Sequence, residues 1–552
     1  MKSIRLHSLI AVAIAAAMFC TFANANTPNI DAGSTLNQNE QELKAFKPVQ
    51  KFQAPNTKSE VKPADDEQTV FINGFRFSGN QLLSDEVLSQ AVATYTNRAL
   101  GLKQLREVAD VVMITYRQAG WTARAYLPKQ EIEDGMVTIQ VVEAVFGGAS
   151  LTGDEPKRIE AKRLIEMAES NLGTGQPLNA KRLDRVLLLL DDLPGVSVAG
   201  HLVPGDQDGE TNLVLAANDE ALYSGNAAVD NQGSRASGSE RLSVNLNINS
   251  PAHLGDLLGI NTIRTQGSEY YRLSYSLPVG YEGWRIGVHA SGLYYRVITS
   301  EFASLNAFGT ATTQGLDFTY PLLRSQLQNI SFSASYDDKQ FHNTSGGTTT
   351  SYAIEAYNAS VNASYVDSWA GGGVTNASVG ITLGDNSADS RYNKLALTVS
   401  RLQSLNETLS VFAAISAQTT KSNLDSSEKM YLGGATGVRA YPASEAGGSQ
   451  GNTLTLELRK NLENNLSLIG FYDYGHVKVN LDNSISSSAN PNDYCLQGYG
   501  VSVAWKPSSA VDVKLTVAQR IGTNPAANSS TGMDGDGTKT ETRIWFSTSI
   551  AF

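Results

Sequence analysis

Long apolar runs are missing from the 552-residue chain once its first 25 residues are set aside. A membrane-spanning helix needs about 20 predominantly apolar residues, and the longest purely aliphatic run covers only residues 186–190. If the protein crosses a membrane, it must therefore cross with β-strands, which in lipid have to close into a barrel.

Cysteine is almost absent as well, with Cys20 and Cys495 as the two examples in the chain. Cys20 falls in a segment that we predict to be removed, so no disulfide is expected within the mature chain. The mature fold should therefore depend on packing and hydrogen bonds alone.

Signatures of catalysis are missing too. The six histidines are scattered without metal-ligand spacing, and no glycine-rich loop with a lysine is present to hold phosphates. Residues 195–199 come nearest to a nucleophile elbow but lack its second glycine. From these missing motifs we expect no enzyme, no metal and no cofactor. The net charge of -11 disfavours a nucleic-acid partner.

The N-terminus has the features of a secretory signal peptide over residues 1–25. Lys2 and Arg5 precede an apolar stretch from Leu9 to Phe22, and small residues follow it up to Ala25. The alternative, a membrane anchor, is disfavoured because the apolar stretch is short.

A short helix is expected within residues 26–46, beginning after Asp31. Its apolar residues are only Leu36, Leu43 and Phe46, so it is polar nearly all round and needs a polar environment if it is stable. Residues 47–68 contain three prolines and mixed charge, which predicts an extended linker. Such a linker can reach about 65 Å.

Two α+β units are predicted next, over residues 69–145 and 146–219. In the first, Leu102, Leu105, Ala109, Val112 and Tyr116 follow the spacing of one helix face. In the second, a helical stripe of leucine and valine over residues 183–190 stops before a Leu-Pro-Gly turn.

From residue 220 to residue 552, strict alternation replaces helical spacing. Apolar side chains alternate with Ser, Asn, Thr and Arg over sixteen segments, an even number, as a closed bacterial barrel requires. These segments begin near residues 220, 239, 256, 269, 284, 312, 328, 352, 371, 393, 409, 451, 466, 495, 511 and 542. A soluble sandwich or solenoid would also alternate, but the chain ends on Phe552, the usual terminal residue of outer-membrane barrels. The prediction is a 16-stranded antiparallel transmembrane β-barrel.

Several motifs occur in a characteristic order along this layout. The first α+β unit contains Gly74-Phe-Arg-Phe-Ser-Gly79, the pair Gly120-Trp121 and Leu127-Pro128-Lys-Gln130, and the second contains Leu193-Pro194-Gly195. These units resemble POTRA domains. The order of two such units before a sixteen-stranded barrel is similar to the outer-membrane transporters of two-partner secretion, the ShlB/FhaC/HecB group of hemolysin secretion and activation proteins.

The stretch Val438-Arg439-Ala440-Tyr441 resembles the VRGY-type loop of this family, and Phe471-Tyr-Asp473-Tyr-Gly475 resembles its F-x-D-x-G motif. The resemblance implies that the loop folds into the barrel and that Arg439 pairs with Asp473. Strand alternation places Asp473 on the inward face with Phe471 and Gly475, and Gly475 leaves room for a loop. Ala440 stands where glycine is commoner in this family. If that position needs a positive φ, alanine would strain the loop.

The resemblance also implies a function: export of an unfolded partner across the Gram-negative outer membrane, with the POTRA domains in the periplasm. The partner would be a large exoprotein with an N-terminal secretion domain, such as a β-helical adhesin or cytolysin, and the barrel would contact outer-membrane lipid. Residues expected to support substrate recognition are Gly74, Gly79, Gly120, Pro128, Gln130, Leu193, Pro194 and Gly195. The N-terminal helix would be a plug in the barrel, with Asp31, Gly33, Leu36 and Leu43 as its site residues.

Two alternatives remain open at this point. One is a barrel assembly and insertion factor of the related superfamily, whose members generally have more POTRA units. The other is a solute channel or a surface adhesin, which has little need of two POTRA-like units.

Overall fold

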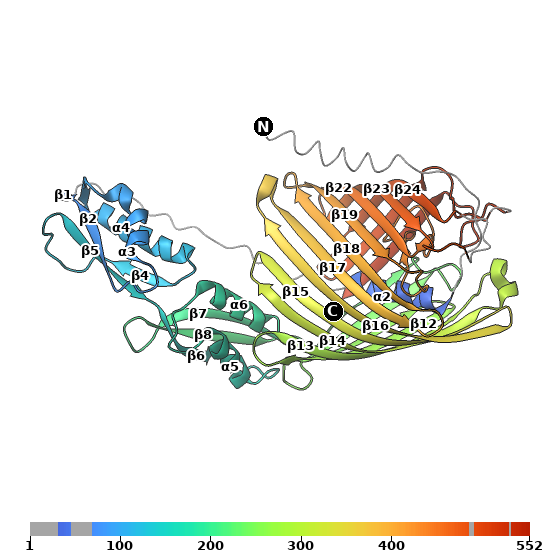
Figure 1. Cartoon of the computed structure of the whole chain (residues 1–552), viewed down its shortest axis with the longest axis horizontal. Helices are drawn as coiled ribbons and strands as arrows, with labels where there is room; N and C mark the ends of the chain where they lie inside the picture. The colour runs from blue at the N-terminus through green and yellow to red at the C-terminus, as the bar shows by residue number, and fades with distance from the viewer. Residues whose placement is uncertain (1–30, 46–68, 485–490, 529–530) are drawn as a thin grey trace.

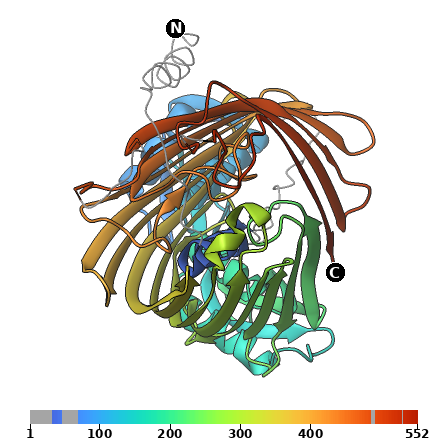
Figure 2. The ribbon, with the colours of Figure 1, turned by 90° about the vertical axis from the view of Figure 1, so that its right-hand side faces the viewer.

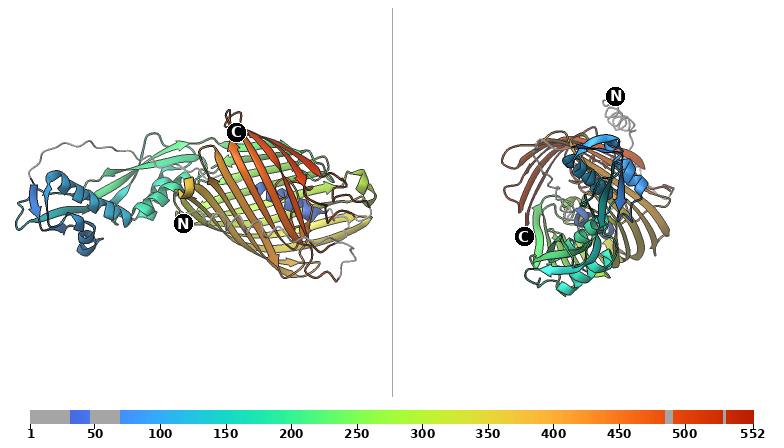
Figure 3. Two further views of the ribbon diagram at one scale, coloured as in Figure 1. Left: turned by 90° about the horizontal axis from the view of Figure 1, so that it is seen from above. Right: turned by 90° about the vertical axis from the view of Figure 1, so that its left-hand side faces the viewer.

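The computed structural model describes residues 31–45, 69–484, 491–528 and 531–552. Two small α+β units and a barrel follow one another along the long axis of the molecule (Figures 1 and 3). None of the helices in the described ranges is long and apolar enough to cross a membrane. The predicted signal peptide and the predicted linker lie outside the described residues.

The first unit packs two helices on a three-stranded sheet. Its sheet has the order β2-β5-β4, and β1 pairs with β3 in a separate ribbon. The elements are β1 (Thr69–Ile72), β2 (Gly74–Ser78), α3 (Asp85–Ala91), β3 (Arg98–Gly101), α4 (Leu102–Gln118), β4 (Ala123–Tyr126) and β5 (Met136–Glu143). The predicted face of α4 is buried except for Leu102, which is 47% exposed because it begins the helix.

The second unit has the same plan, with two helices and a sheet of order β6-β8-β7. Its elements are β6 (Val145–Thr152), α5 (Ala161–Leu172), α6 (Ala180–Asp191), β7 (Val196–Pro204) and β8 (Glu210–Asp219). Backbone hydrogen bonds join the units, because Thr122 donates to the Leu178 carbonyl (3.1 Å) and Ala180 donates to the Gly120 carbonyl (2.9 Å).

Sixteen antiparallel strands close into a barrel, as the alternation predicted. Each begins within four residues of its predicted start. They are β9 (Tyr223–Asp230), β10 (Arg241–Asn249), β11 (Leu257–Arg264), β12 (Ser268–Val279), β13 (Trp284–Arg296), β14 (Phe308–Arg324), β15 (Gln328–Ser345), β16 (Thr348–Asp367), β17 (Gly373–Asn386), β18 (Arg391–Ser404), β19 (Leu409–Thr420), β22 (Gln450–Asn461), β23 (Leu466–Lys478), β24 (Asp493–Trp505), β25 (Val511–Arg520) and β26 (Thr542–Ala551).

The barrel wall separates two environments. Apolar side chains such as Leu316, Tyr357 and Ile544 are more than half exposed on the outward face. On the inward face, charged and polar residues including Lys339 and Asp473 are buried by elements inside the barrel. An exposed apolar band of this extent matches a lipid-facing surface rather than a soluble one.

Two elements occupy the interior. Helix α2 (Ala32–Ala45) lies inside the ring of strands (Figure 2), and the long segment 421–449 between β19 and β22 folds inward, with the short pair β20 (Met430–Tyr431) and β21 (Gly447–Gly448). Segment 421–449 is called the lumen loop below.

Cys495 lies on β24, with its Sγ 3.4 Å from the Tyr474 hydroxyl oxygen. The other cysteine of the chain, Cys20, lies outside the described residues. The absence of a disulfide from the mature chain therefore stays a prediction.

Candidate functional site in the barrel lumen

Arg439, at the tip of the lumen loop, lies against the inward face of β23. Its Nε and Nη2 atoms donate to the two oxygens of Asp473, each at 2.8 Å, and its backbone N–H donates to Asp473 Oδ2 at 3.1 Å. The side chains are only 5% and 1% exposed. A forked, charge-assisted pair of this kind fixes orientation as well as position.

Glu457 of β22 is a second carboxylate at this site, and motif analysis did not identify it. Its Oε1 accepts from Arg439 Nη1 at 2.7 Å, while Oε2 lies 2.6 Å from Nη2 of Arg459. Leu454, Leu456 and Leu458 alternate with Glu457 along the strand. That alternation indicated an inward side chain, although not its partner.

Small residues on the wall make room for the loop. A Cβ atom at Gly475 would lie 3.0 Å from Cγ2 of Val438, and one at Gly498 would lie 2.5 Å from Cβ of Ala440. Ala440 is not among the positive-φ residues of the described chain, so the strain considered for alanine at this position does not arise. The ring of Phe471 packs 3.5 Å from Cζ of Arg439, close enough for a cation–π contact.

The neighbouring part of the loop is held by segment 521–541, which connects β25 and β26. Buried Glu445 accepts from Asn524 Nδ2 (2.9 Å) and from the Gly535 N–H (3.0 Å). Asp534 in turn pairs with Arg520 and Arg543. Burial raises the pKa of Glu445 from its ordinary value near 4.5 to about 7, although the Asn524 bond acts in the opposite direction. Tyr441 is fully buried with Arg520 over its ring, at 4.5 Å.

Helix α2 is seated by polar contacts as well as by a small apolar face. Ala32 and Leu36 are buried against tyrosine and phenylalanine side chains of the wall, and Leu43 is partly buried there. Asn37 donates to the carbonyls of Ser427 (2.8 Å) and Lys429 (3.0 Å) of the lumen loop. Glu42 forms an ion pair with Arg241 of β10. This explains how a helix with few apolar residues is stable: its partners are themselves polar.

The N-terminal end of α2 fits closely against the lumen loop. Asp31 accepts from the Ser426 hydroxyl at 2.8 Å, and it also accepts from the Ser34 N–H. A side chain at Gly33 would overlap Ser426 Oγ. Below these contacts, Glu428 of the loop is buried between Lys339 Nζ (2.9 Å) and Lys394 Nζ (2.6 Å) of the wall. The helix therefore rests on a loop segment that is itself anchored by charge.

The eight predicted recognition residues do not form one surface. In the first unit, the Gln130 amide bridges the backbone N–H and carbonyl of Thr138 (2.7 Å each) beside Pro128, and Gly79 has a φ of +86°. Gly74 begins β2. These residues shape the ends of the sheet.

The remaining four lie at joints between domains. Gly120 accepts the hydrogen bond from Ala180 that joins the two units. At the turn of Leu193, Pro194 and Gly195, Leu193 is buried beside Gly255, and a Cβ at Gly195 would lie 3.2 Å from Ser250 Cβ. The turn thus contacts the barrel segment between β10 and β11.

The same face of the second unit docks on neighbouring turns of the barrel. Arg324 forks onto Asp192 (2.7 and 2.8 Å), Arg185 donates to the Pro321 carbonyl (2.7 Å), and the Tyr281 hydroxyl donates to Glu166 (2.6 Å). These contacts fix the second unit at one end of the barrel.

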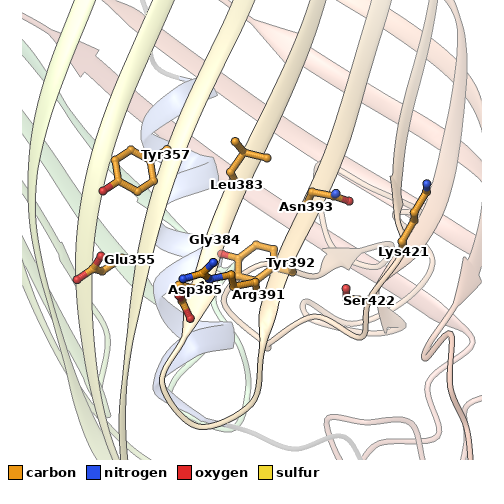
Figure 4. Close-up of a pocket in the computed structure, with 10 residues that line it drawn as sticks. All are labelled: Glu355, Tyr357, Leu383, Gly384, Asp385, Arg391, Tyr392, Asn393, Lys421 and Ser422. Carbon is orange, nitrogen blue, oxygen red and sulfur yellow. Dashed lines mark hydrogen bonds and ion pairs between the residues drawn. The ribbon is translucent and has the colours of Figure 1, made fainter.

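A depression of about 500 Å³ lies on the barrel wall beside Lys421 and Ser422, the first residues of the lumen loop (Figure 4). It is lined by Glu355, Asp385 and Arg391, which are paired across β16, β17 and β18, beside Tyr357 and Leu383 on the outward face. Arg439 and Asp473 are not among the residues that line it.

The family model of the haemolysin secretion/activation protein ShlB/FhaC/HecB matches residues 209–503, and the ShlB-type POTRA domain model matches residues 70–144. The chain belongs to the ShlB/FhaC/HecB family. It is an outer-membrane transporter of two-partner secretion, and its POTRA domains lie in the periplasm.

Relatives of this transporter support the same assignment. It is 24% identical over 467 residues to the heme/hemopexin transporter protein HuxB of Haemophilus influenzae strain 86-028NP, with 81% of this chain and 82% of HuxB covered. It is 23% identical to the outer membrane transporter CdiB of Dickeya dadantii, with 68% and 70% covered.

The fold of this family member is also found in a solved structure. CdiB from Escherichia coli matches with a TM-score of 0.72 at 18% identity, covering 96% of this chain and all of that one. The barrel-assembly alternative is not favoured, because the family models that match are those of secretion transporters.

Proposed function

We propose that the transporter captures an unfolded, large exoprotein in the periplasm and passes it through the lumen after α2 and the lumen loop move aside. The observation that carries this proposal is the nature of the two obstructions. Both are seated in the lumen by hydrogen bonds and ion pairs, including Asn37 to the lumen loop and Arg439 to Asp473, in addition to apolar packing against the wall. Such contacts can be exchanged for water in a hydrated channel, since a solvated charge or amide keeps its hydrogen bonds.

Capture in the periplasm requires a surface that accepts an extended chain. In the first POTRA domain, β4 is an edge strand of the sheet β2-β5-β4 with α4 packed beside it. In the second, β7 is an edge strand with α6 beside it. An extended segment can add to such an edge by main-chain hydrogen bonds, and the groove beside the helix can accommodate its side chains.

The cargo is proposed to carry an N-terminal secretion domain and to form a β-helical adhesin or cytolysin outside the cell. Folding outside would bias movement outwards, because a folded domain cannot re-enter the lumen. No nucleotide is needed for that bias.

The experiment is deletion of the transporter gene, followed by measurement of one candidate exoprotein in the medium and of total outer-membrane proteins. Loss of the exoprotein alone supports the proposal. General depletion of outer-membrane proteins would instead indicate a barrel-assembly role, and unchanged export of every secreted protein would contradict both.

A further inference from the structure

The pairing that closes the barrel is incomplete along β26. Strand β26 pairs with β25 from Thr542 to Ile550, but it pairs with β9 only from Ser547 to Ala551. Residues 542–546 therefore have a ladder on one side only. On the other side, Asn231 supplies substitute bonds: its backbone N–H donates to the Phe546 carbonyl (3.2 Å), and its side chain bonds the backbone of Ile544 (3.0 Å) and Phe546 (2.8 Å).

This weakly paired half of β26 is held from inside the barrel. Trp545 points inward and is 7% exposed, whereas its neighbours Ile544 and Phe546 point outward and are 58% and 40% exposed. The Trp545 indole Nε1–H donates to the backbone carbonyl of Arg439 at 2.7 Å. The donor and the acceptor are both buried, so breaking this bond would leave two polar groups unpaired.

The bond connects two parts of the wall through the loop. The side chain and backbone N–H of Arg439 bind Asp473 on β23, and its carbonyl binds Trp545 on β26. If Arg439 leaves Asp473, the carbonyl that holds Trp545 moves with it.

The opposite strand of the closing pair is held from inside as well. Arg241 of β10 forks onto Asp230, the last residue of β9, with its Nε 3.1 Å from Oδ1 and its Nη2 3.1 Å from Oδ2. Arg241 also pairs with Glu42 of α2. The lumen loop thus contacts β26 of the closing pair, and α2 contacts β10, the direct neighbour of β9.

We propose that Trp545 is a positioning residue that couples the lumen loop to the closing strand pair. While Arg439 is docked, the loop holds residues 542–546 in place; when the loop leaves, this half of the β26–β9 seam loosens. The inference rests on the proposed role of Arg439 as a releasable latch, but it concerns the wall rather than transport.

The test is hydrogen–deuterium exchange of the purified full chain in lipid nanodiscs, read on peptides covering residues 542–551. Trp545→Phe keeps an aromatic ring in place and removes the N–H donor together with one ring of the indole. We expect exchange of residues 542–546 to accelerate by about fivefold to tenfold, the factor that corresponds to one buried hydrogen bond. Residues 547–551 and β25 should be unchanged. Trp505→Phe, at a tryptophan that is 45% exposed on β24, is the matched control and should change nothing at the seam.

Arg439→Ala provides a second route that leaves the sequence of β26 intact, and it should accelerate the same peptide. Unchanged exchange in both variants would overturn the inference, as would a uniform acceleration over all strands, which indicates general destabilisation. If Arg439→Ala reduces export while exchange at the seam stays unchanged, the proposed role of Arg439 in export is supported and the coupling to the β26–β9 seam is contradicted. If exchange at the seam rises while export is normal, the coupling is supported and the proposed role of Arg439 in export is contradicted.

Discussion

Asp473 receives three hydrogen bonds from Arg439, two from the guanidinium group at 2.8 Å and one from the backbone N–H at 3.1 Å. A single carboxylate on the wall therefore fixes both the side chain and the backbone of the loop tip. Since the pair is almost fully buried, removal of Arg439 takes away the charged partner of Asp473, at a cost of about 3–5 kcal/mol. Removal of the Asp473 charge leaves Arg439 paired with Glu457 alone.

Arg439→Lys should reduce export, because lysine keeps the charge but cannot form the fork. Arg439→Ala should reduce it further, to about a tenth or less. The measurement is partner protein in the medium, divided by the amount of folded transporter in the outer membrane, which should not change. Arg391→Ala, at an outward arginine that is 87% exposed, is the control and should export normally. Normal export by Arg439→Ala would contradict the proposed role of the Arg439–Asp473 contact in export.

The two carboxylates around Arg439 should differ in importance. Asp473→Asn removes the charge that supports the fork, whereas Glu457→Gln leaves the fork intact and affects only the third contact. We expect the thermal midpoint of the purified protein to fall more for Asp473→Asn than for Glu457→Gln. The reverse order would mean that Glu457 is the main anchor.

Gly33→Val should expel α2 from its seat, since any side chain at position 33 would overlap Ser426 Oγ. The expected result is a severalfold rise in ion conductance in planar bilayers, equal to that of a chain lacking residues 27–46. Gln38→Ala changes a partly buried residue of the same helix and should conduct like the parent protein. If the deletion itself leaves conductance unchanged, α2 is not the plug.

Stability should decrease between about pH 5 and pH 7. The folded protein binds a proton at Glu445 more tightly than the unfolded chain does, because burial raises the pKa of this carboxyl from near 4.5 to about 7. The free energy of unfolding therefore falls as pH rises through this window, by about 1–3 kcal/mol, and is level above it. Glu445→Gln should reduce the slope and raise the melting temperature at pH 7.5. The Glu42 pKa is also raised to about 7 by burial, so part of the slope should remain. An unchanged slope in Glu445→Gln would contradict this assignment.

Alternation along the strands was sufficient to predict the barrel, because one face meets lipid and the other meets polar partners over the whole domain. It also placed Asp473 inward, since Leu468 and Tyr472 point outward on the same strand. Glu457 was missed because alternation gives the face of a residue but not which of many inward charges a distant loop will reach. The contact of the Leu193-Pro194-Gly195 turn with the barrel was not predicted, and the role of this turn in recognition stays a prediction. Contacts between domains leave no periodic pattern in the sequence of either domain.

The joints of the periplasmic arm have a mechanical consequence. Backbone hydrogen bonds connect Gly120 to Ala180, and the Arg324–Asp192 fork connects the second POTRA domain to the barrel. Rotation at either joint would break several bonds at once. The two POTRA domains therefore keep a fixed orientation relative to the barrel. A chain bound at the first POTRA domain then lies at a set distance and angle from the pore entrance.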